Sequence, residues 1–174
     1  MTQDLTGTYE VIAERSNLEF SVRHMVVSHV KGQFIDFEGT VKIDSDLLKS
    51  TGKGKIRASS ISTGDDIRDK HVRSQDVLHV ASYPFIEFKS LSIRDSHSGL
   101  VVTGNLTIKG NTNPIELDIR NYKLLDNDCL RISATSKLSR KQFKVTWNAL
   151  IEASSAVVSD NVDLTLDIIL HKSK

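Results

Sequence analysis

Apolar and polar residues alternate along most of the chain with a period of two. In the segment 17–24, for example, Leu18, Phe20 and Val22 share one parity, and polar or charged residues take the other. Alternate side chains of a strand point to opposite faces, so each such run predicts a strand with one apolar and one wet face. The pattern predicts roughly nine strands, at about residues 8–14, 18–24, 33–43, 53–62, 85–93, 99–108, 114–123, 129–137 and 160–171.

One stretch, "TGDDIRDKHVRSQDVLHVASYP" at 63–84, interrupts this alternation. It predicts a short helical insertion near residues 65–80. Thr63 or Asp65 can cap the start of the helix, where acidic side chains also suit the helix dipole. Pro84 disfavours a helical conformation for Tyr83 and so ends the insertion.

Short turns between the strands predict antiparallel pairing. An antiparallel sheet of this size has two exposed edges unless it closes on itself. The expected fold class is therefore all-β, an antiparallel β-barrel of about eight strands, which is wide enough for side chains or for one ligand. No repeat or linker divides the sequence, so residues 1–174 are expected to form one domain.

The parity expected to face the barrel interior is apolar, with small residues such as Gly39, Ala58, Ser60, Gly104 and Ala134 among the large ones. Two interpretations stay open. The small residues either interlock with large ones and fill the interior, or they leave an elongated apolar cavity. A polar rim over such a cavity would suit a ligand with a long tail and a polar head.

The charge composition argues against some partners. The chain has 23 Lys and Arg, 22 Asp and Glu, and a formal net charge of +1. A dedicated nucleic-acid binder usually carries a basic surplus, so none is expected as a partner. Cys129 is the single cysteine and cannot form an intramolecular disulfide. No signal-peptide pattern or membrane-spanning stretch is present, so we expect a cytoplasmic protein without stable membrane insertion, although transient membrane contact is compatible with the sequence.

The sequence contains only weak signals for a metal site or a catalytic site. The spacings His24–His29 and His71–His79 do not place two imidazoles on one ion, so neither a metal nor another cofactor is expected. On a helix, Asp69 and His71 diverge by about 200°, a poor geometry for a catalytic pair. No catalytic residue is therefore assigned. A hydrolase using a serine with Asp69 and His71 stays the catalytic alternative.

Five stretches in order resemble the YceI-like family, from about Tyr9 to Leu170: "FSVRHMVVSHVKGQF", "SSISTGDDIRDKHVRSQDVL", "YPFIEFKS", "VTGNLTIKGNTNPIEL" and "SRKQFKVTWN". The resemblance implies a lipocalin-like barrel that binds polyisoprenoids or similar amphiphiles and is often dimeric. By position, the family's functional and motif residues match His24, Arg68, Asp69, His71, Arg140, Phe143 and Trp147. Lys144 replaces a glycine common in relatives, and "EASSAVVSD" replaces a more glycine-rich hairpin.

The expected function is a non-catalytic carrier, a homodimer that holds an isoprenoid such as an isoprenoid quinone or diphosphate. The tail is expected against apolar residues, namely Phe20, Val22, Met25, Ile35, Phe37, Ile86, Phe88, Leu106, Phe143, Trp147 and Leu166. The head group is expected near a polar mouth formed by His24, Arg68, Asp69 and His71. Whether Arg68 and His71 touch the ligand or only brace the helix stays open. The alternatives are an enzyme acting on an isoprenoid diphosphate through the Asp69/His71 region and a scaffold barrel that acts through its surface.

Overall fold

The alternating segments form eleven strands in the part of the chain that the structure, a computed structural model, describes: residues 3–24, 28–126, 128–146 and 158–174. The strands are β1 (Gly7–Val11), β2 (Asn17–His24), β3 (Ser28–Phe34), β4 (Phe37–Ile43), β5 (Thr51–Arg57), β6 (Ile61–Ser62), β7 (Phe85–Ser96), β8 (Gly99–Ile108), β9 (Asn111–Leu124), β10 (Cys129–Ser139) and β11 (Val158–Lys172). The helix α1 spans Asp66–Arg73, and short 3₁₀ turns lie at η1 (Ala13–Arg15), η2 (Leu47–Lys49), η3 (Ala58–Ser60) and η4 (Arg140–Phe143).

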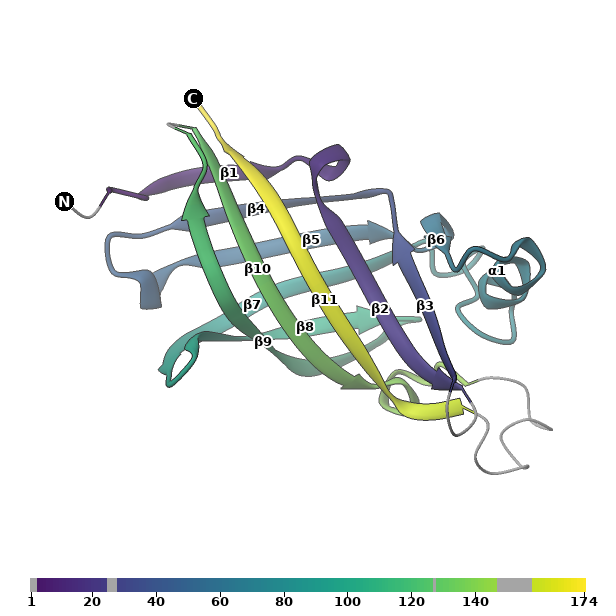
Figure 1. Cartoon of the computed structure of the whole chain (residues 1–174). Helices are drawn as coiled ribbons and strands as arrows, with labels where there is room; N and C mark the ends of the chain where they lie inside the picture. Colours follow the sequence, from purple (N-terminus) through teal and green to yellow (C-terminus); the bar gives the residue numbers. More distant parts are fainter. Residues whose placement is uncertain (1–2, 25–27, 127, 147–157) are drawn as a thin grey trace.

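The strands close into an antiparallel barrel (Figure 1). Eight of them follow one another in the order β1-β4-β5-β7-β8-β9-β10-β11, and β1 pairs again with β11 to complete the ring. This architecture confirms the predicted fold class. The helix α1 lies beside β6 at one end of the barrel, and the β4–β5 and β7–β8 hairpins turn at the opposite end (Figure 1). Within the described residues, no helix is long and apolar enough to span a bilayer.

The long strand β11 closes the ring by pairing with two strands on the same side. Its C-terminal end pairs with β1, and its N-terminal part pairs with β2. Between them η1 interrupts the edge, and there Ile169 N–H donates to Ser16 Oγ at 2.9 Å while Ile12 N–H donates to Ile169 O at 2.8 Å. These bonds satisfy the backbone of β11 across the interruption, so the sheet edge stays paired.

The strand expected at 33–43 is wrong, because the chain reverses inside it. Phe34 ends β3 and Phe37 begins β4, and the turn between them is held by Asp36, which accepts from Arg57 N–H at 2.9 Å and from Arg57 Nε at 3.0 Å. Ile35 lies in this turn and is 63% exposed, so it does not face the interior. Residues 28–32, which lie outside the predicted strands, are part of β3.

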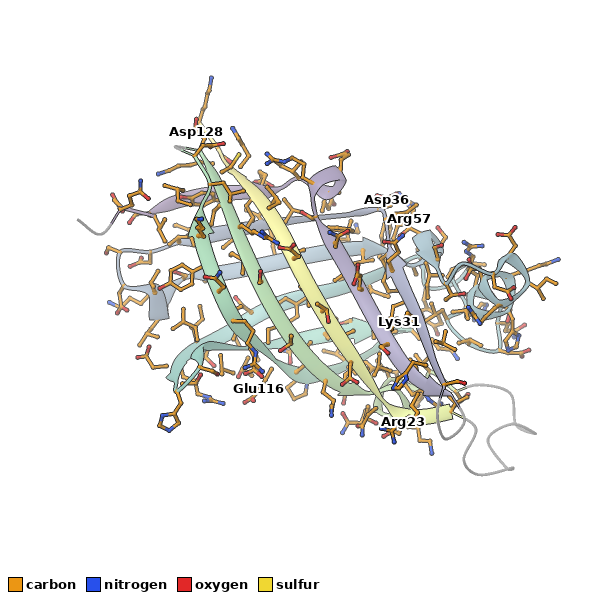
Figure 2. The ribbon with its side chains drawn as sticks, viewed as in Figure 1. Arg23, Lys31, Asp36, Arg57, Glu116 and Asp128 are labelled. Atoms are coloured by element: carbon orange, nitrogen blue, oxygen red, sulfur yellow. The ribbon has the colours of Figure 1, made fainter. Side chains whose placement is uncertain are left out.

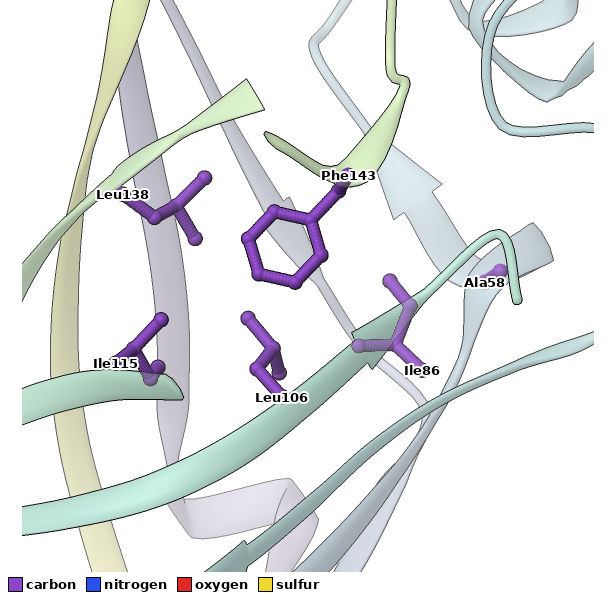
Figure 3. Close-up of a cluster of buried hydrophobic side chains, with 6 residues drawn as sticks. All are labelled: Ala58, Ile86, Leu106, Ile115, Leu138 and Phe143. Atoms are coloured by element: carbon purple, nitrogen blue, oxygen red, sulfur yellow. The ribbon is translucent and has the colours of Figure 1, made fainter. Parts of the chain in front are cut away.

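Apolar side chains face inward and most charged ones face outward (Figure 2). Three buried clusters form the packed parts of the interior. The first is centred on Phe143 and is formed by Ala58, Ile86, Leu106, Ile115, Leu138 and Phe143 (Figure 3). The second lies around the N-terminal strand and is formed by Tyr9, Ile43, Leu130 and Leu170. The third joins α1 and the turn after it to β6 and is formed by Ile61, Val72, Val77 and Leu78.

The tips of two phenylalanine rings lie close to glycines of the neighbouring strand. A Cβ added at Gly104 would overlap the ring of Phe88, and one added at Gly32 would overlap the ring of Phe20. Each ring therefore rests against backbone along the barrel wall, a cross-strand arrangement that only glycine allows at this closeness.

We expect Gly104→Ala to lower the free energy of unfolding by about 1–3 kcal/mol, since the new methyl group must displace the ring of Phe88 from the wall. Urea denaturation monitored by circular dichroism measures this. The matched control is Gly54→Ala, whose Cβ would meet Glu38 O only at an ordinary 3.6 Å. The control should be as stable as the wild type or gain up to about 1 kcal/mol. Equal effects at both sites would contradict the packing of Phe88 on Gly104.

Candidate functional site

The interior of the barrel holds an apolar cavity in two compartments. The first, of about 170 Å³, lies towards α1 and is called here the helix-side compartment. The second, of about 280 Å³, extends along β4 and β5 and is called the glycine-side compartment. The residues that characterise the first are Phe20, Val22, Val72, Ile86, Leu138 and Val162, and those that characterise the second are Phe37, Gly52, Gly54, Phe88, Leu166 and Ile168.

The two compartments meet at a set of four branched side chains that lines both of them. These residues come from four strands around the barrel and are called the waist: Leu18, Ile56, Leu106 and Leu164. Of these, Leu106 belongs to the buried cluster around Phe143. The waist therefore lies where the cavity passes the buried cluster around Phe143, against which Ile56 and Leu164 also pack.

Buried clusters bound the cavity at both ends. Val72, Val77 and Leu78 line the helix-side compartment and are packed with Ile61 beneath α1. At the other end Leu130 and Leu170, both fully buried, line the glycine-side compartment. An elongated apolar space is the shape that suits a long hydrocarbon chain.

Seven of the predicted tail-contact residues line the cavity. Phe20, Val22 and Ile86 lie on the helix side, Phe37, Phe88 and Leu166 on the glycine side, and Leu106 at the waist. The sequence left open whether the small inward residues fill the barrel or leave a cavity, and the structure has the cavity, with Gly39 and Ala134 on its wall.

The other predicted contacts lie elsewhere. Phe143 is fully buried and points towards Leu138, Leu106 and Ile86 from η4, so it supports the wall from within the packed cluster (Figure 3). Ile35 lies exposed in the β3–β4 turn, as described above. Met25 and Trp147 lie outside the described residues. His24 ends β2, where it pairs with Ser28 in the backbone register, and its side chain is not described.

Three of the predicted polar residues are on α1. Asp65, and not Thr63, caps this helix. Its side chain accepts hydrogen bonds from the N–H groups of Ile67 and Arg68, each at 3.0 Å. Asp69 is buried and His71 is half-buried. The cavity-lining residues of the described chain include neither Arg68, Asp69 nor His71.

Thr63 joins the cavity wall to α1. Its hydroxyl donates to Asp69 Oδ1 at 2.6 Å, and its N–H donates to the same oxygen at 2.8 Å. Arg68 Nε donates to the Thr63 hydroxyl at 2.8 Å, and Arg68 NH2 donates to Thr63 O at 2.8 Å. These three residues, Thr63, Arg68 and Asp69, are called the brace. A second arginine, Arg73, donates to Ser59 O and Ile61 O, each at 2.9 Å, and so ties the end of α1 to the same segment.

Arg140 is the charged residue that is most deeply placed in the cavity wall of the described chain, at 5% exposure. Its Nε donates to Ser159 O at 2.8 Å, and its other nitrogens donate to Val145 O and Val158 O, each at 3.1 Å. A buried charge requires such partners. The arginine therefore joins Val145, just after η4, to the start of β11 at the helix-side compartment.

Asp160 anchors the start of η4. Burial raises the pKa of Asp160, but hydrogen bonds from the Ser139 hydroxyl at 2.6 Å and from Lys141 N–H at 3.0 Å outweigh it, and the pKa lies below its usual value. The carboxylate is thus the form that fits this corner.

The small inward residues named from the sequence do not include Gly52 and Gly54, although both line the glycine-side compartment. The signal was present, since both glycines share the parity of Ile56. In the part of the chain that the structure describes, no three His, Cys, Asp or Glu side chains are grouped to hold a metal ion.

Comparisons with known proteins agree on one family. The family model of the YceI-like domain matches residues 9–170. A UPF0312 protein of Staphylococcus aureus (strain bovine RF122 / ET3-1) is 30% identical over 153 residues, which cover 84% of this chain and 87% of the relative.

Solved structures share the fold at lower identity. Burkholderia cenocepacia BcnA has a TM-score of 0.78 at 23% identity, with coverage of 91% of this chain and 98% of that one. A polyisoprenoid binding domain from Saccharophagus degradans implicated in plant cell wall breakdown has a TM-score of 0.74 at 16% identity, with coverage of 95% and 98%. With a family model that spans nearly the whole barrel, the chain belongs to the YceI-like family.

Proposed function

We propose that this protein is a non-catalytic carrier that holds a long-chain isoprenoid or a similar amphiphilic lipid inside the barrel. The observation that carries the proposal is the apolar cavity, which runs through both compartments and is bounded by buried clusters at its ends. The structural neighbour from Saccharophagus degradans, a polyisoprenoid binding domain, supports the same class of ligand.

The energetics favour a carrier over a tight trap. A five-carbon isoprene unit contributes about 4 kcal/mol on leaving water, at about 0.8 kcal/mol per CH₂. Three or four such units outweigh an association penalty of about 4–15 kcal/mol. In a cell, however, the tail starts in a membrane and is already out of water. The free energy of burying the tail is then nearly the same in the pocket and in the bilayer. The shape of the cavity and the contacts of the head group therefore decide how the lipid distributes between protein and membrane.

We place the head group at the helix-side end. Thr63 and Arg140 lie in the wall of that compartment, and α1, which carries the predicted polar residues Arg68, Asp69 and His71, lies at the same end of the barrel. His24, at the end of β2, and His71, on α1, are proposed to lie near the head group. A diphosphate would use positive charge there, and a quinone would use neutral hydrogen bonds.

Arg68 and Asp69 are assigned a bracing role in this proposal. Arg68 uses Nε and NH2 on Thr63, and one oxygen of the buried Asp69 accepts twice from Thr63. Groups engaged in this way hold α1 against the cavity wall. The same engagement argues against the rival enzyme, which needs Asp69 to be open to a substrate.

The homodimer, the cytoplasmic location and the transient membrane contact stay predictions from the sequence. Sedimentation equilibrium, cell fractionation and flotation with vesicles address the three in turn.

The carrier proposal predicts that the purified protein contains a long-chain amphiphile, detected by native mass spectrometry and by organic extraction. Leu164→Trp places a large ring at the waist and should lower the lipid content by at least about tenfold, since a core cannot take up this volume without displacing its contents. Thr165→Trp is the matched control, because Thr165 is its exposed neighbour on β11. Wild-type protein that is reproducibly empty and takes up no added prenol would contradict the carrier function.

The bracing role predicts that Thr63→Val destabilises α1. The change keeps the shape of the side chain but removes the hydroxyl that serves both Arg68 and Asp69, at a cost of about 1–3 kcal/mol. Amide hydrogen exchange in α1 and urea denaturation measure the effect. Thr165→Val, on the outward face of β11, should change neither by more than about 0.5 kcal/mol. Unchanged exchange in α1 of Thr63→Val would contradict the brace.

A further inference from the structure

We propose that the cavity takes one extended chain of about 15–20 carbons, or three to four isoprene units, and that Gly52 and Gly54 set this length limit. The inference rests on the proposed carrier function and adds the chain length and the residues that measure it.

The volumes of the two compartments give a first estimate of the number of carbons that the cavity can hold. An apolar cavity of about 150 Å³ takes up one benzene ring, which corresponds to about 25 Å³ per carbon. On this scale the helix-side compartment, of about 170 Å³, has room for about seven carbons, and the glycine-side compartment, of about 280 Å³, has room for about eleven. A chain that fills both is close to a farnesyl or geranylgeranyl group in size.

The length of the cavity gives a second estimate of the chain length of the ligand. The lining residues of β11 run from Val158 to Leu170, which is about 40 Å of strand and about 30 Å along the axis of a barrel with tilted strands. An isoprenoid of 15–20 carbons has about 12–16 of them in its main chain, so with bonds of about 1.5 Å it is about 15–20 Å long when extended. Such a chain fits the length of the cavity, passing between the waist side chains Leu18, Ile56 and Leu164.

The glycines explain why the second compartment is the larger. Gly52 and Gly54 lie on the inward face of β5, in register with Val41 and Gly39 of β4. A Cβ added at Gly54 would meet only Glu38 O at 3.6 Å, and one at Gly52 would meet Val41 Cγ2 at 3.7 Å and Thr40 O at 3.9 Å. Both contacts are of ordinary van der Waals length. A longer side chain at either position therefore projects into the space that the end of the tail would occupy.

The glycines also differ from the two that support aromatic rings. Gly32 and Gly104 have no room for a Cβ because Phe20 and Phe88 lie on them. Neither Gly52 nor Gly54 has a positive φ, so larger residues are compatible with their backbone conformation. Packing and backbone geometry thus leave the volume of the cavity as the property that these two glycines serve.

The test measures binding of geraniol, farnesol, geranylgeraniol and solanesol to the delipidated full-length chain, by competition with anilinonaphthalenesulfonate. For the wild type, affinity should rise from geraniol to geranylgeraniol and not rise further with solanesol. Gly54→Leu adds about 100 Å³ of side chain, close to one isoprene unit. This variant should bind geranylgeraniol at least about tenfold more weakly than the wild type, since the displaced CH₂ groups lose their burial. Farnesol should then be its best ligand.

The matched control is Lys42→Leu, which adds the same side chain to an exposed residue of β4, in register with Thr51 of β5 and outside both compartments. It should bind the series as the wild type does. Gly52→Val is a second, smaller filling change, which keeps the test usable where Gly54→Leu folds poorly, and it should shift the preference in the same direction.

The outcomes separate the two proposals. Wild-type binding that keeps rising to solanesol, or filled variants that bind the series as the wild type does, would overturn the length limit while the carrier function stands. If none of the prenols binds the wild type, the carrier function fails, and the length limit fails with it.

Discussion

Closure of the sheet by β11 is the constraint on which the rest of the structure depends. Because β11 pairs with β1 at one end and with β2 at the other, the ring of eight strands satisfies its own backbone hydrogen bonds. Three buried clusters pack parts of the interior, and an apolar cavity occupies another part of it.

The polar residues of the α1 end follow from this arrangement. The end of the barrel must be covered, and the cover must stay in place without a large core of its own. Thr63, Arg68 and Asp69 do this with short hydrogen bonds, and Arg140 does the same for the chain beside η4. Charged residues that the sequence groups together thus divide into those that hold the wall and those, such as His71, that are proposed to lie near a ligand head group.

Much of the fold could be predicted from the sequence, because strand alternation and the interrupted segment are local properties. The insertion expected near 65–80 contains α1, and the barrel closes with the expected number of strands. Ile35 was misplaced because the β3–β4 turn has no glycine or proline and is held by Arg57, which is distant in the sequence. The cavity could not be predicted, since its volume depends on where rings such as Phe88 lie and on the space left beside glycines such as Gly54, neither of which the strand pattern gives.

The central claim is that the barrel is hollow along its axis and holds a single hydrocarbon chain. A crystal structure of the protein with farnesol tests it most directly. The account predicts continuous ligand density inside the barrel, with the hydroxyl towards Thr63 and the chain passing Leu106 towards Gly54. Density confined to the outer surface, or an interior closed by side chains between Phe20 and Phe88, would contradict it.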